Sequence, residues 1–154
     1  MSDTATKRRS VPGIFCVEGS WTSRLTNTQS VKPLLEFLKD SDKVRYVYRP
    51  AASRDDFLDV VRKWPQQQYR RYSVGWFASH GGPGCLYVGR RQITLAELGE
   101  ELRGACAGKL IYFGGCGILN IPSGEIDAFR KETRARCVAG YVEVAIQRGC
   151  ARSW

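Results

Sequence analysis

The chain has 154 residues, and its 24 Lys and Arg against 15 Asp and Glu give a formal net charge of +9. About 100–200 residues make one domain, and 43% hydrophobic with 25% charged residues is ordinary for a globular protein. These values exclude a mostly disordered chain, a collagen-like chain and a coiled coil. No apolar run approaches the roughly 18 residues of a membrane span, and the start, MSDTATKRRSVPG, has no apolar signal core. We therefore expect a cytoplasmic protein with no membrane partner.

The first half of the chain alternates between strand-like and helix-like segments. Residues 1–11 are polar and basic, and we expect a disordered tail there. The apolar run 13–18 predicts a buried strand, and residues 30–40 have apolar side chains at helical spacing. Residues 44–49 predict a second strand. Ser53 and Asp56 resemble a capping box ahead of a helix over 54–66.

The second half continues the alternation. Residues 73–79 predict a strand that runs directly into His80-Gly81-Gly82, and a small hairpin follows around Gly89-Arg90-Arg91. Thr94 and Glu97 form a capping box for the next helix. The remaining predicted elements are a helix over 95–106, a strand over 109–113, a helix over 123–134 and a strand over 136–142.

This order of elements predicts an α/β fold for residues 12–154, as a single domain. Repeated strand–helix units with continuous apolar strands favour a largely parallel central sheet of about five strands, with helices on both faces. The small hairpin follows the third strand of that sheet.

Histidine and cysteine usage narrows the chemistry. His80 is the one histidine, which excludes zinc peptidases and other sites that need two imidazoles. The six cysteines form no CxxC pair, so zinc ribbons and thioredoxin-like motifs have no support. In a reducing cytoplasm these thiols stay free. Cys16 and Cys137 lie in apolar runs, as expected of small buried residues.

Two predicted strands end in the same pattern: an apolar run, a reactive side chain and glycines. One reads VGWFAS before His80-Gly81, and the other reads LIYFGG before Cys116-Gly117. If these strands are parallel neighbours, His80 and Cys116 leave the same sheet edge side by side, where sites of open α/β sheets lie. A thiol of pKa near 8.5 is mostly protonated at neutral pH, so nucleophilic attack needs an adjacent base. His80 can serve as that base, and the backbone N–H groups of Gly81 and Cys116 can form an oxyanion hole.

The two motifs, FASHGG and IYFGGCG, resemble those of the caspase-like cysteine peptidases, in particular the bacterial CHAT domains. The likeness covers residues 73–142, and residues 13–66 in element order alone. It implies that Cys116 is the nucleophile, His80 the general base and acid, and Gly81 the oxyanion-hole glycine of a thiol protease. His80 and Cys116 are 36 positions apart in the sequence, fewer than the roughly 50 of caspases.

The resemblance implies peptide-bond hydrolysis through a thioester acyl-enzyme, with no metal or organic cofactor. The partners would be a protein or peptide substrate and a regulatory protein. GGCG replaces the QACRG of caspases, so specificity for aspartate does not carry over. Asp127 and Glu143 follow the nucleophile and would favour a basic substrate residue. Because few residues follow the last predicted strand, the chain resembles a C-terminally truncated or minimal member.

Two alternatives of other classes remain open. The first is a caspase-like scaffold or interaction domain without activity. The second is a nucleic-acid-binding module, supported by the charge of +9, although the basic residues are scattered and a specific nucleic-acid site is not expected. The sequence contains no GxSxG nucleophile motif, no complete phosphate-binding loop and no complete dinucleotide fingerprint.

Overall fold

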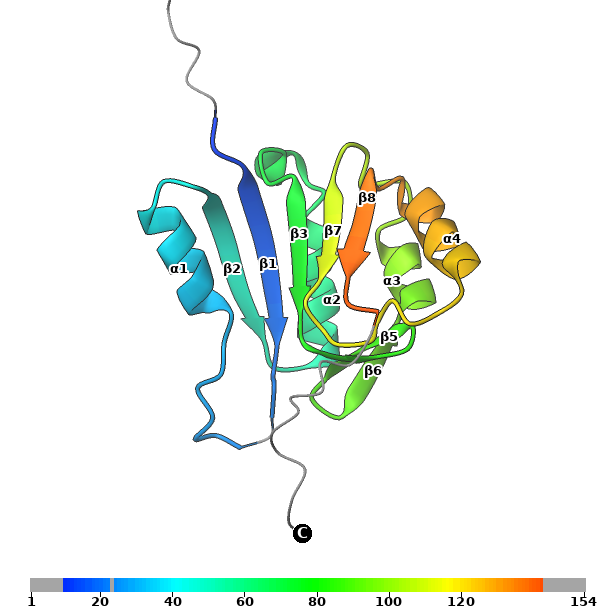
Figure 1. Cartoon of the computed structure of the whole chain (residues 1–154), viewed down its shortest axis with the longest axis horizontal. Helices are drawn as coiled ribbons and strands as arrows, with labels where there is room; N and C mark the ends of the chain where they lie inside the picture. The colour runs from blue at the N-terminus through cyan, green and yellow to red at the C-terminus, as the bar shows by residue number, and fades with distance from the viewer. Residues whose placement is uncertain (1–9, 23, 143–154) are drawn as a thin grey trace, which may run out of the picture.

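A computed structural model describes residues 10–22 and 24–142 (Figure 1). Five strands form a parallel sheet in the order β2-β1-β3-β7-β8, which confirms the predicted α/β fold. They are β1 (Gly13–Gly19), β2 (Arg45–Ala51), β3 (Val74–Ala78), β7 (Leu110–Phe113) and β8 (Cys137–Gly140). The predicted basic tail falls largely outside the described residues, as does the segment 143–154.

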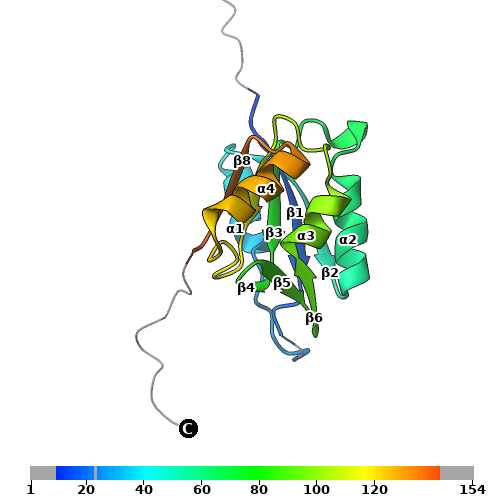
Figure 2. The ribbon, with the colours of Figure 1, turned by 90° about the vertical axis from the view of Figure 1, so that its right-hand side faces the viewer.

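Four helices cover the sheet, and they divide unequally between its faces (Figures 1 and 2). They are α1 (Lys32–Asp40), α2 (Arg54–Lys63), α3 (Leu95–Glu101) and α4 (Ser123–Thr133), and a short 3-10 helix, η1 (Gln67–Tyr69), follows α2. Successive side chains of β1 point to opposite faces of the sheet, so β1 contributes to the packing on both faces. Phe15 and Val17 enter the larger core with α2, α3 and α4, while Cys16 packs with Leu35 of α1 in a smaller cluster.

The helix starts follow the predicted capping chemistry. The Ser53 hydroxyl accepts a hydrogen bond from the Asp56 N–H at 3.1 Å at the start of α2. Thr94 and Glu97 form a complete capping box at the start of α3. These bonds satisfy N–H groups that a helix leaves free in its first turn.

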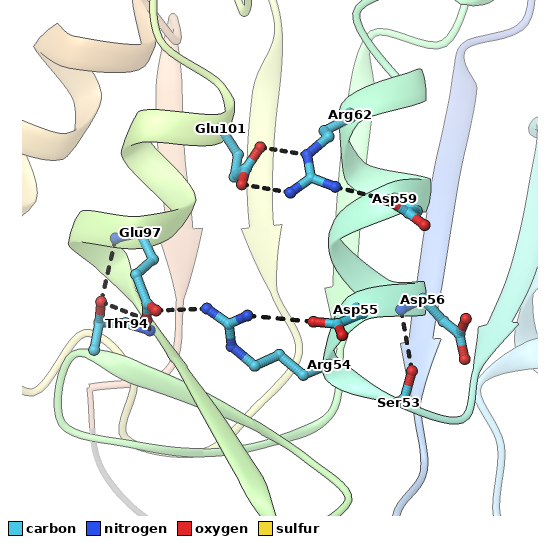
Figure 3. A network of polar contacts seen from close by, with 9 residues as sticks. All are labelled: Ser53, Arg54, Asp55, Asp56, Asp59, Arg62, Thr94, Glu97 and Glu101. Atoms are coloured by element: carbon cyan, nitrogen blue, oxygen red, sulfur yellow. Dashed lines mark hydrogen bonds and ion pairs between the residues drawn. The ribbon is translucent and has the colours of Figure 1, made fainter.

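Ion pairs join α2 to α3 along one side of the molecule (Figure 3). Arg54 binds Glu97 at 2.5 Å, and Arg62 makes two bonds to the Glu101 carboxylate, at 2.5 and 2.7 Å. The bond from Arg62 lowers the pKa of Glu101.

One predicted helix is too long. We expect a helix over 95–106, whereas α3 ends at Glu101. The backbone N–H groups of Gly104 and Cys106 bond instead to the carbonyls of Glu132 and Thr133, at 2.8 and 2.9 Å. Contacts with the end of α4 therefore replace the last helical turn.

The predicted hairpin has a third strand. β4 (His80–Gly82), β5 (Cys85–Val88) and β6 (Arg91–Thr94) form an antiparallel sheet, so His80 begins a short strand rather than a plain turn. This sheet lies beyond the carboxyl ends of the five parallel strands, at the lower edge in Figure 1. None of the helices in the described ranges is long and apolar enough to cross a membrane.

Candidate active site

The two strands that carry the sequence motifs are parallel neighbours. β3 pairs with β7 so that Phe77 lies opposite Phe113. His80 and Cys116 each follow these paired residues by three positions. Both residues therefore leave the same edge of the sheet at matching points, as the motifs predict.

The loops after these strands pack closely against each other. A Cβ on Gly81 would overlap the Ile118 side chain and lie 3.0 Å from the Cys116 carbonyl oxygen. A Cβ on Gly115 would lie 2.6 Å from the Ser79 carbonyl oxygen. The overlap with Ile118 and the 2.6 Å distance to Ser79 are closer than a real Cβ allows, so glycine is required at both positions for this close approach. The backbone bond from Gly84 N to Ile118 O, at 2.9 Å, holds the two loops together.

His80 is exposed, and its ring is held by the loop after β1. The ring atom Nε2 lies 2.6 Å from the Trp21 carbonyl oxygen. Because a carbonyl oxygen only accepts hydrogen bonds, Nε2 must carry the hydrogen. In the neutral imidazole this leaves Nδ1 as the proton acceptor. The Trp21 ring also packs against the His80 ring, edge to face, with centroids 5.2 Å apart.

Cys116 is a half-buried free thiol. Among the hydrogen bonds of residues 10–22 and 24–142, that of the His80 ring goes to Trp21 and none joins it to Cys116. The Cys116 N–H has no acceptor among those bonds either, which suits a predicted oxyanion donor. The backbone nitrogen of Gly81 lies against Gly115, 3.1 Å from the position of a Cβ there. The two predicted oxyanion donors therefore belong to loops in direct contact.

A cavity of about 310 Å³ lies beside His80. Its walls come from the loops after β1, β2 and β3 and from the hairpin of β5 and β6. The lining residues are Ser20, Trp21, Thr22, Ala52, His80, Tyr87, Gly89 and Arg90. In the strand order β2-β1-β3, the chain passes from β1 to β2 on one side and then crosses to β3 on the other side of β1. In open α/β sheets, ligands bind beyond the carboxyl ends of the two strands at such a point. Arg90 is exposed, and no carboxylate is among these lining residues.

The predicted substrate-binding acids lie elsewhere or outside the described residues. Asp127 is exposed on α4, where its carboxylate lies 3.5 Å from Arg130. It does not line the cavity beside His80. Glu143 belongs to the residues that the structure does not describe.

Sequence reasoning missed Trp21 and Glu18. Glu18 is the second-last residue of β1 and is 4% exposed, yet it bears a carboxylate. An acidic residue near the end of an apolar strand was the available signal, but three of its four donors lie 12 to 30 positions away in the sequence. For metal binding, the described chain contains no group of three or more His, Cys, Asp or Glu side chains that could hold an ion.

The sequence matches the family described as "Family of unknown function (DUF6642)" over residues 12–151, and the chain belongs to that family. A search of curated proteins finds no match.

Proposed function

We propose that this member of a family of unknown function is a caspase-like cysteine endopeptidase, with Cys116 as nucleophile and His80 as general base and acid. One observation carries the proposal: His80 and Cys116 occupy matching positions after two paired parallel strands, on loops in direct contact. The bond from His80 Nε2 to the Trp21 carbonyl adds support, because it leaves Nδ1 free to accept a proton.

The reaction follows from these groups. His80 Nδ1 takes the proton of the Cys116 thiol, and the sulfur attacks the scissile carbonyl carbon to form a C–S bond. The Cys116 and Gly81 N–H groups stabilise the oxyanion. The C–N bond then breaks, and His80 returns the proton to the leaving amine. Water, deprotonated by His80, attacks the thioester and releases the acid and the free thiol.

A cytoplasmic setting fits this proposal, because the nucleophile must remain a reduced thiol. The substrate would be a protein or peptide whose side chain enters the cavity beside His80. The arrangement requires no metal or organic cofactor for these steps. A regulatory protein would be a second partner.

A second candidate is an inactive scaffold domain with the same fold. The observation that favours it is the His80 ring bond to Trp21 without a bond to Cys116. Catalytic hydrogen bonds are often long before substrate binds, which is why the peptidase remains the first choice.

Labelling with limiting iodoacetamide across pH 5–9, read by intact mass, separates the two candidates. For the peptidase we expect one fast adduct on Cys116, slowed by the His80→Ala substitution. Cys137, which the sequence predicts to be buried, is instead exposed at the start of β8, and it serves as the ordinary thiol for comparison. Burial raises the pKa of Cys106 to about 12, so that thiol should stay unlabelled. Equal, slow labelling of Cys116 and Cys137 would support the scaffold and overturn the peptidase.

A further inference from the structure

Glu18 is a buried carboxylate surrounded by hydrogen-bond donors. It is 4% exposed, and within the described residues it pairs with no cation. Four donors reach its two oxygens: Tyr48 OH at 2.5 Å, Trp21 Nε1 at 2.5 Å, Ser30 Oγ at 2.6 Å and Val31 N at 2.8 Å. Burial and the bond to Glu18 raise the pKa of Tyr48 to about 12, which keeps this hydroxyl a donor at neutral pH.

These bonds close the loop between β1 and α1. Trp21 lies near the start of the loop, and Ser30 and Val31 lie at its end. Residues 24–29, between them, are all exposed. A loop with so little buried surface is held by its end contacts, and Glu18 supplies contacts at both ends. Burying a carboxylate is unfavourable unless donors satisfy it, and here the four donors do so and fix the carboxylate in place.

Trp21 connects the carboxylate to the candidate active site. Its indole N–H donates to Glu18, while its backbone carbonyl accepts from His80 Nε2 at 2.6 Å. Its ring also packs against the imidazole edge to face. The position of the carbonyl that selects the His80 tautomer therefore depends on the bond between Glu18 and Trp21.

We infer that Glu18 is a positioning residue, which acts through Trp21 to keep the hydrogen of His80 on Nε2 and to leave Nδ1 as the base. The importance of this role for catalysis rests on the proposed function. The tautomer itself is a property of the folded protein and can be measured without any activity.

The chain offers a direct test, because His80 is its one histidine and its ring nitrogens give unambiguous NMR signals. Trp21→Phe keeps the backbone carbonyl and an aromatic ring but removes the indole N–H. Glu18→Leu removes both acceptor oxygens at similar side-chain volume and provides a second variant. Tyr48→Phe is the matched control, since it removes a donor from the same carboxylate and leaves both bonds of Trp21. Thermal unfolding confirms that each variant is folded.

We expect the ring nitrogen shifts of the wild type and of Tyr48→Phe to report the Nε2–H tautomer. Trp21→Phe and Glu18→Leu should show a mixture of tautomers. In both variants, iodoacetamide labelling of Cys116 at neutral pH should be slower by about 10-fold to 100-fold, because misplacing a catalytic group lowers the reaction rate by roughly that factor. An unchanged tautomer in Trp21→Phe, or an equal change in Tyr48→Phe, would overturn the inference. A wild-type Cys116 that labels slowly, with the tautomer changes as expected, would instead overturn the proposed function alone.

Discussion

The contact between the His80 and Cys116 loops can be tested by adding one methyl group. Gly81→Ala would place a Cβ in overlap with Ile118, 2.8 Å from its Cδ1 and 3.0 Å from the Cys116 carbonyl oxygen. Ile118 is fully buried, so it has no open space to enter. Overpacking of this kind costs about 1–3 kcal/mol of unfolding free energy. We expect the substitution to fall in that range and to slow labelling of Cys116, since the loops must separate.

A double-mutant cycle isolates the contact from other effects. Ile118→Ala alone should cost about 2–5 kcal/mol through the cavity that it leaves. In the double variant the methyl group added by Gly81→Ala occupies part of that cavity, so the combined loss should be smaller than the sum by about 1 kcal/mol or more. Urea unfolding followed by tryptophan fluorescence gives all four free energies.

Gly124→Ala is the matched control, because this helical glycine of α4 has no atom within 4 Å of its would-be Cβ. It should be neutral or stabilise by up to about 1 kcal/mol. A Gly81→Ala variant that loses less than about 0.5 kcal/mol, the range of ordinary surface substitutions, would refute the close packing of the two loops. Additive losses in the cycle would refute it as well.

Two further predictions concern charge. The pKa of Glu101 is lowered by its bond from Arg62, so this pair stabilises the fold above the unfolded Glu pKa of about 4.3 and loses its effect as pH falls through the lower folded value. Arg62→Gln should therefore cost about 0.5 kcal/mol in urea at pH 7, as partly exposed pairs do, and a loss that persists at pH 2 would contradict this. Arg90 lines the cavity beside His80 and no carboxylate is among its lining residues, so we expect this cavity to prefer an acidic substrate side chain. For peptide ketones that alkylate Cys116, Arg90→Glu should lower the preference for an acidic over a neutral side chain by about fivefold, a charge effect of about 1 kcal/mol. Arg91→Glu, outside the cavity beside His80, should change it less, and equal effects would contradict recognition there.

Local patterns were enough to predict most of the elements. Alternating or continuous apolar runs set the strands, and the Thr94–Glu97 capping box marked a helix start, because these signals depend on residues a few positions apart. The end of α3 could not be predicted in this way. Its last expected turn is replaced by bonds from Gly104 and Cys106 to the end of α4, about 30 residues later in the chain.

The candidate site likewise has one part that the sequence predicts and one part that it does not. The sequence by itself determined that His80 and Cys116 follow similar strands, and parallel pairing then brings them to one edge. The tertiary structure alone decided that the Trp21 carbonyl holds the His80 ring and that Glu18 holds Trp21. The physical reason is that a buried carboxylate takes its donors from whatever the fold brings near. Trp21 is three positions from Glu18, but the other donors are 12 to 30 positions away and His80 is 59 positions from Trp21, so no local pattern connects the whole set.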